Sequence, residues 1–316
     1  MMQRVMAVAL VMLAGVGGVL AAGTIEEALA LFPGTTDVAV PFSEEGGAQL
    51  AAAIETVKEA LGVPDYLDEE SESEVGSFPV AAEDKHLVNV LSQAYYTYAD
   101  VFLREQPHQR STFLKGKQWG FKGLRMNPVF VAFEQQDGFV AAVNAETDVA
   151  TLFWANGCWL RWAEPDILAA IKAGIAKKSL AMSERVLELD PSYANYGAYR
   201  ALAAFWQGLP SDPISALFTG GLMQDYEKVL YYFCHVVDEP SYCNVVASLL
   251  DPVCLEYLEN RVMFAEYYLM PLGHWQDAER VLQSAVDAPI GESFILYNAL
   301  SREIAASLLA EVREHL

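Results

Sequence analysis

The basic side chains of this chain gather in one short stretch, and clustered cations can bind an anion or an acidic partner. Six of the 20 Lys and Arg residues lie between positions 104 and 125, where Glu105 is the one acidic residue. They are Arg104, Arg110, Lys115, Lys117, Lys122 and Arg125. In a helix, Lys115, Lys122 and Arg125 share one stripe, whereas Lys117 points towards the opposite side. This stripe is interpreted either as a docking site for a partner, aided by long-range attraction, or as a solvated helix face.

Large aromatic residues form a second group, accompanied by two amides. The group consists of Trp154, Trp159, Tyr267, Tyr268 and Tyr297, with Asn156 and Asn298. Buried rings usually fill the core of a helical protein. A ligand cleft also combines apolar rings with a few polar groups. Both interpretations stay open, and these seven residues are the candidates for a ligand cleft.

Familiar catalytic patterns are missing from the sequence. It contains no G-x-S-x-G, H-E-x-x-H, Walker or G-x-G-x-x-G motif, and its five histidines are scattered. Gly116, Gly120 and Gly123 recur at helical spacing, which indicates close helix packing rather than a phosphate loop. We therefore predict no catalytic residue, no enzyme activity and no cofactor.

The cysteines and the acidic residues suggest no metal site. The cysteines at positions 158, 234, 243 and 254 include no C-x-x-C pair, so zinc is not expected. A disulfide among the last three is plausible, but four cysteines allow three complete pairings. Residues 65–84 are rich in Asp and Glu without a basic residue, which is typical of an exposed, mobile linker. The alternative, a calcium loop, lacks the Asp-x-Asp-x-Asp spacing.

Composition and the first residues restrict the class of protein further. The chain of 316 residues has a formal charge of −22 and is 53% hydrophobic, which excludes a nucleic-acid binder and a disordered chain. Arg4, the apolar run 5–20 and the small residues 21–23 predict a secretory signal peptide cleaved near Gly23. An uncleaved anchor is the alternative. The first cysteine is Cys158, so we expect an exported, periplasmic protein without a lipid anchor.

Hydrophobic spacing is helical along most of the chain. Leu87, Leu91, Ala94, Tyr98 and Phe102 recur on one helix face, and no segment alternates like a strand. Further helices are expected at 110–126, 146–162, 166–189, 193–206, 225–238, 255–270, 275–287 and 293–315. We predict an all-α protein of irregular TPR-like helical hairpins, packed as a compact solenoid or bundle. The expected divisions are a signal peptide at 1–23, short helices and the acidic linker at 24–84, and the TPR-like domain at 85–316.

One hairpin is clear in the C-terminal half. Ala265 and Leu269 lie on one predicted helix, Pro271-Leu272-Gly273 turns the chain, and Ala278 and Leu282 lie on the next helix. The small residues allow two antiparallel helices to approach closely, and the leucines fill the space between them. Scaffolds of such hairpins expose concave grooves that bind peptides, proteins or small molecules.

Several stretches together resemble the TRAP transporter T-component family over residues 85–310. They are Leu152–Asn156, Val186–Tyr193, Gly220-Gly221 before Glu227-Lys228, Phe264–Tyr268, Trp275–Ala278, Leu296–Leu300 and Ala306–Leu309. Two features depart from the family pattern: Leu222-Met223-Gln224 separate the glycine pair from Asp225, and the cysteine-bearing stretch between Tyr231 and Leu255 is longer.

The resemblance implies a non-enzymatic helical protein that works outside the cytoplasmic membrane. Its partner would be the solute-binding (P) subunit of a tripartite transporter, and a central pore or cleft would hold a small hydrophobic, amphiphilic or organic-acid ligand. The candidates for partner docking are Lys115, Lys122, Arg125, Gly220 and Gly221. A homo-oligomer is compatible with the sequence. The alternative function is a general TPR-like envelope adaptor unrelated to transport.

Overall fold

All regular elements described by the structure are helices. The computed structural model describes residues 23–34, 37–64, 67, 69–104, 106–165, 174–243 and 250–316. Within these ranges there is no strand, which confirms the all-α prediction. No helix in the described part of the chain is long and apolar enough to cross a membrane. Residues 1–22 of the signal peptide predicted at 1–23, and the start of the helix predicted at 166–189, fall outside the described residues.

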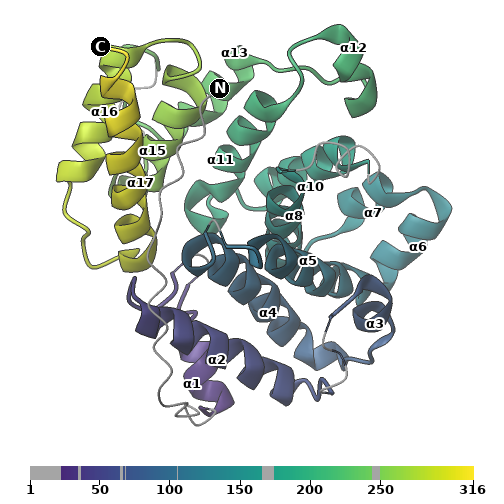
Figure 1. The fold of residues 1–316 in the computed structure, drawn as a ribbon. Coiled ribbons are helices and arrows are strands. Elements are labelled where there is room, and N and C mark those ends of the chain that lie inside the picture. The colour runs from purple at the N-terminus through teal and green to yellow at the C-terminus, as the bar shows by residue number, and fades with distance from the viewer. Residues whose placement is uncertain are drawn as a thin grey trace.

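The N-terminal helices share a core with the start of the predicted TPR-like domain (Figure 1). They are α1 (Ile25–Ala30), α2 (Glu44–Ala60), α3 (Glu72–Ser77), the 3₁₀ turn η1 (Ala82–Asp84), α4 (Lys85–Thr97) and its π-helical extension η2 (Tyr98–Phe102). Leu50 and Val57 of α2 and Leu91 of α4 are fully buried in this core. The expected division at residue 84 stays a prediction.

The middle helices pack closely because glycines face neighbouring backbones. They are α5 (Gln109–Arg125), α6 (Pro128–Gln136), α7 (Phe139–Ala145), α8 (Val149–Ala163) and α10 (Ile175–Leu189). A Cβ atom on Gly120 would lie 2.6 Å from the Cα atom of Ala155, and one on Gly116 would lie 2.6 Å from Sγ of Cys158. These approaches confirm that the spaced glycines of α5 serve helix packing.

The C-terminal helices contain the predicted hairpin. They are α11 (Tyr193–Gly208), α12 (Pro213–Ala216), η3 (Leu217–Thr219), α13 (Tyr226–Phe233), α14 (Pro252–Glu256), α15 (Glu259–Phe264), its π-helical extension η5 (Ala265–Leu269), α16 (Trp275–Asp287) and α17 (Ile295–Arg313). Leu269 and Leu282 are fully buried in one core, and Gly273 turns the chain with a φ of 73°. The hairpin is therefore confirmed.

The last helix joins the two ends of the molecule. Leu296 and Leu300 of α17 pack into the N-terminal core, whereas Leu309 lies in the C-terminal core. The hydroxyl of Tyr297 lies 3.1 Å from Oγ1 of Thr97 in α4. In the view of Figure 1, α4, α8 and α11 lie in the middle of the molecule, with α1 and α2 below them and the α15–α17 group to the left. Four helix ends can therefore meet in the interior: those of η2, α8, α11 and α15.

A disulfide joins Cys234 to Cys243, whereas Cys158 and Cys254 are buried free thiols. The bridge closes a short loop and restricts the unfolded chain, so its loss reduces stability. We expect the double substitution Cys234→Ser, Cys243→Ser to lower the free energy of unfolding by about 2–3 kcal/mol, measured by urea unfolding.

Unfolding in dithiothreitol provides the control for this prediction. The reductant should destabilise the wild-type protein to the level of the double variant and leave that variant unchanged. A wild-type protein whose reduced form unfolds at the same urea concentration as its oxidised form would contradict the prediction.

Candidate functional site

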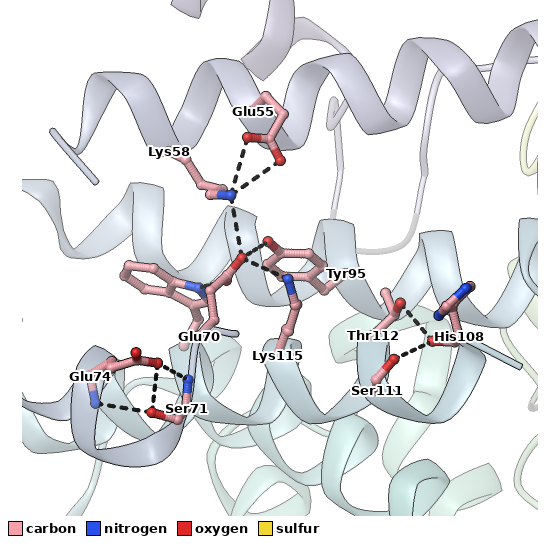
Figure 2. Close-up of polar contacts among 11 residues, drawn as sticks. Glu55, Lys58, Glu70, Ser71, Glu74, Tyr95, His108, Ser111, Thr112 and Lys115 are labelled. Carbon is pink, nitrogen blue, oxygen red and sulfur yellow. Dashed lines mark hydrogen bonds and ion pairs between the residues drawn. The ribbon is translucent and has the colours of Figure 1, made fainter. Parts of the chain in front are cut away.

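The predicted docking stripe on α5 contacts the chain's own acidic segment, and Glu70 is the most enclosed residue of this contact. Its side chain is 0% exposed and accepts from four donors. Oε1 lies 3.3 Å from Nζ of Lys58, 3.3 Å from Nζ of Lys115 and 2.6 Å from the hydroxyl of Tyr95, and Oε2 lies 2.5 Å from Nε1 of Trp119. Figure 2 shows Lys58, Tyr95 and Lys115 converging on Glu70 from different helices. The carboxylate therefore joins α2, α4 and α5.

Electrostatics around Glu70 favour the charged lysine and the neutral tyrosine. Burial lowers the pKa of Lys58, but the carboxylates of Glu70 and Glu55 outweigh this effect, and the net pKa is raised. Burial, together with the charge of Glu70, raises the pKa of Tyr95 far above its ordinary value. Lys58 therefore remains a cation, and Tyr95 remains a hydrogen-bond donor at neutral pH.

Other cations of α5 bind the segment that follows Glu70. Nζ of Lys122 donates to the carbonyl oxygens of Gly76, at 3.2 Å, and of Phe78. Glu72 lies 3.1 Å from Nζ of Lys117 and 3.6 Å from the guanidinium of Arg125. Lys117 thus shares a carboxylate with Arg125 although its position in the helix points elsewhere, because a long lysine stem can carry the ammonium around the helix.

The acidic segment consequently differs from the exposed, mobile linker that its charge predicts. Glu70 is buried, residues 72–77 form α3, and Lys122 holds the backbone beyond them. A run of acidic residues indicates solvation only when no basic surface faces it, and here α5 supplies that surface. Residues 65, 66 and 68 lie outside the described part of the chain. Partner docking by Lys115, Lys122 and Arg125 stays a prediction, and all three cations already have contacts within the chain.

Removing the charge of Glu70 tests its role in joining the helices. We expect Glu70→Gln to lower the free energy of unfolding by about 2–4 kcal/mol, because the two lysines lose their counter-charge and one acceptor oxygen becomes an amide NH2 that faces donors. The matched control is Glu69→Gln, at the exposed neighbouring position, which should change stability by less than about 0.5 kcal/mol. Equal effects of the two substitutions in urea unfolding would contradict this role.

The predicted Gly220-Gly221 loop adjoins an apolar surface tip formed by Ile214, Leu217 and Phe218. These side chains are 75%, 75% and 62% exposed. Gly220 and Gly221 have φ angles of 72° and 90°, which residues with a side chain rarely adopt. The glycines therefore turn the chain directly after the apolar tip.

Most of the seven predicted cleft residues occupy separate parts of the interior. Trp159 packs edge-on against Phe121 at 5.0 Å, and Tyr268 stacks on Phe264 at 5.4 Å in a different core. Nε1 of Trp154 donates to the hydroxyl of Tyr193 at 3.2 Å. These contacts are those of core filling. The structure does not bring all seven residues into one cleft.

The two predicted amides make buried structural hydrogen bonds. Oδ1 of Asn298 accepts from the backbone N–H of Leu258 at 3.0 Å, and its Nδ2 donates to the carbonyl oxygens of Glu256 and Ile290. Nδ2 of Asn156 donates to Oγ of Ser183 at 2.8 Å. Of the predicted set, Tyr267 lies beside a group of interior charges, as described next. The ligand cleft itself stays a prediction.

A set of interior charges, which sequence reasoning missed, lies where the helices meet. This central cluster comprises Asp100 of η2, Arg161 of α8, Glu164, Arg200 of α11, Glu259 of α15 and Glu266 of η5. The guanidinium of Arg161 lies 2.7 Å from Asp100 and 2.7 Å from Glu164. Nε of Arg200 lies 3.1 Å from Glu259. Two of the carboxylates, Asp100 and Glu266, belong to π-helical segments, which are often found at functional sites.

Arg200 is fixed by a strained turn at the start of α11. Ala194, Asn195 and Tyr196 all have positive φ angles, an arrangement that costs energy in residues other than glycine. The guanidinium of Arg200 donates to the carbonyl oxygens of Ala194 and Asn195, and it lies 4.5 Å from the ring centre of Tyr257. The same side chain thus stabilises the strained turn and holds Glu259.

The central cluster is interior but retains accessible surface. Burial raises the pKa of Glu259 despite the opposing charge of Arg200, yet 26% of the Glu259 side chain is exposed. The Arg161 side chain is 29% exposed. Arg161 therefore reaches solvent while it is paired to Asp100.

A pocket of about 180 Å³ opens at this cluster. It is lined by Gln109, Arg110, Phe113, Arg161, Glu164 and Pro165. This volume accommodates several waters or a small organic molecule. Among the described residues, no three His, Cys, Asp or Glu side chains form a group able to hold a metal ion. The geometry therefore suits reversible binding of a small molecule with a polar or charged group.

Sequence offered only a faint signal for this cluster. Its members are scattered from position 100 to position 266, and each is the lone charge or one of few in its own stretch. Arg161 lies among the tryptophans of α8, and Arg200 lies among alanines and aromatic residues in α11. A charge inside an apolar helix is the feature that singles out both residues.

Comparison with known families agrees with the sequence interpretation. The model of the TRAP transporter T-component family matches residues 80–213. The family resemblance is confirmed. The matching T-component segment contains Asp100, Arg161 and Arg200 of the central cluster, and the whole basic stripe of α5. No curated protein matches the chain.

Proposed function

We propose that the chain is a non-enzymatic accessory protein of a tripartite TRAP transporter, which binds the solute-binding subunit and holds a small organic ligand. The observation that carries this proposal is the T-component match over residues 80–213, which relates the chain to TRAP transport. The pocket at Arg161 supports the ligand part of the proposal because charged groups there combine with an aromatic wall, Phe113.

The apolar tip supports the partner part of the proposal. Ile214, Leu217 and Phe218 follow directly on the T-component match, and Gly220-Gly221 shape the adjacent turn. Contiguous exposed apolar side chains are a common feature of protein-binding surfaces. An aromatic residue at the centre of such a surface often carries much of the binding energy. We therefore place the solute-binding subunit on this tip.

The proposed location is outside the cytoplasmic membrane. The first residues have the three parts of a secretory signal peptide, with a cleavage site near Gly23. The disulfide between Cys234 and Cys243 supports export, since structural disulfides persist mainly in oxidising compartments.

Co-purification from envelope extract tests the function. Tagged wild-type protein should recover a TRAP solute-binding subunit, and Phe218→Asp should reduce the recovered amount at least tenfold, because an aspartate cannot be buried in an apolar contact. The matched control is Ile295→Asp. Ile295 is 52% exposed at the first position of α17, where an acidic residue suits the helix dipole. This control should recover as much subunit as the wild type.

Three outcomes would contradict the proposal or part of it. Folded wild-type protein that never recovers a solute-binding subunit would remove its basis. Recovery of other envelope proteins in place of that subunit would favour the general TPR-like adaptor. Equal recovery by wild type and Phe218→Asp would move the docking surface away from the apolar tip.

A further inference from the structure

A second pocket lies between α3 and the basic stripe of α5, and it shares no lining residue with the pocket at Arg161. Its volume is about 90 Å³, which accommodates a few water molecules or one compact ionic group. The residues that line it are Glu72, Gly76, Gln118, Phe121, Lys122 and Arg125. Two cations, one carboxylate and one amide thus surround the same small space.

Lys122 brings to this pocket an ammonium group that no carboxylate of the described residues neutralises. Its Nζ donates to the carbonyl oxygens of Gly76, at 3.2 Å, and of Phe78. Burial lowers the pKa of the ammonium, and no nearby carboxylate opposes this effect. The two carbonyl oxygens replace water around the ammonium but carry no net charge. An anion in the pocket would therefore supply Lys122 with a counter-charge.

Glu72 is the one carboxylate among the lining residues, and it is weakly held. It lies 3.1 Å from Nζ of Lys117 and 3.6 Å from the guanidinium of Arg125, but 56% of its side chain is exposed. Exposed ion pairs contribute little free energy, so this carboxylate can turn to solvent at small cost. Arg125 has a second partner, Glu134, at 3.1 Å. Three cations, including Lys122, would then face one carboxylate, an excess of two positive charges.

We propose that this pocket binds a phosphate monoester group in place of the Glu72 carboxylate. Such a group carries about −1.5 to −2 charges at pH 7, which matches the excess better than the single charge of a carboxylate ligand. Its oxygens accept from Lys117, Lys122 and Arg125. A guanidinium binds phosphate through two parallel hydrogen bonds, and an ammonium adds a point charge. The amide of Gln118 adds an uncharged donor to the same space.

Calorimetric titration of the full exported chain at pH 7.5 tests this site with two probes of similar size, ethyl phosphate and propionate. Ethyl phosphate should bind about tenfold more tightly than propionate, because its second charge is used. Glu72→Gln should tighten the binding of ethyl phosphate about threefold, since the competing carboxylate is removed. Lys122→Gln should weaken it about fivefold or more.

Each variant has a matched control. Glu74→Gln removes the same charge from the same helix, and its glutamine still suits the capping box with Ser71. Lys228→Gln removes an exposed lysine from α13. Both controls should bind ethyl phosphate like the wild type. Circular dichroism establishes that each variant is folded, and Glu72→Gln tests the site even if Lys122→Gln loosens α3.

A small soluble ester and a lipid headgroup can both supply the phosphate monoester. Co-sedimentation with vesicles of phosphatidic acid in phosphatidylcholine separates these sources. Vesicle binding that Lys122→Gln abolishes identifies a lipid headgroup, whereas binding of ethyl phosphate without vesicle binding identifies a soluble ester.

Three results overturn the proposed phosphate site. They are absence of binding to both ethyl phosphate and the vesicles, propionate binding as tight as that of ethyl phosphate, and equal affinities of folded Glu72→Gln and Glu74→Gln for ethyl phosphate. Recovery of the solute-binding subunit is measured separately, so a chain that fails the titration keeps its proposed function.

Discussion

A single buried carboxylate, Glu70, fixes the N-terminal part of the structure. Burial of an ionised group is unfavourable unless donors surround it, and here donors come from α2, α4 and α5. Glu70 also has a positive φ of 49°, a conformation that an isolated glutamate would avoid. The ion pairs and hydrogen bonds of one side chain thus compensate for both its burial and its backbone conformation. They also explain why an acidic segment lies on the basic face of α5.

The interior charges depend on this arrangement. α4 continues into η2, which carries Asp100, and α5 packs through its glycines on α8, which carries Arg161. The contact between Asp100 and Arg161 therefore requires that α4, α5 and α8 keep their positions relative to one another. Both oxygens of the Glu70 carboxylate are engaged, and its role is structural.

Sequence patterns predicted the parts of the fold that depend on neighbouring residues. The helix expected at 275–287 coincides with α16, and the break at Asp190-Pro191 separates α10 from α11. Helical periodicity and turn residues carry that information locally. The packing role of Gly116 and Gly120 was also predictable, because their spacing places them on one helix face.

Contacts between residues far apart in the sequence could not be predicted in the same way. The charge of residues 65–84 alone indicated a solvated linker. No local pattern in the sequence shows that Lys115 contacts Glu70 or that Lys122 contacts the backbone of Gly76. The disulfide partner of Cys234 was one of several options, and the fold selects Cys243. The aromatic residues chosen for a cleft largely fill separate cores, since a tryptophan in a helix looks the same in sequence whether it lines a pocket or a core.

The central claim is that this T-component relative holds both a solute-binding subunit and a small ligand. Native mass spectrometry of the protein, purified from its own envelope without denaturation, tests both parts in one measurement. We expect a complex of the chain with a TRAP solute-binding subunit, from which activation releases a small organic molecule. A bare chain, under conditions in which a control complex of similar affinity survives, would contradict the account.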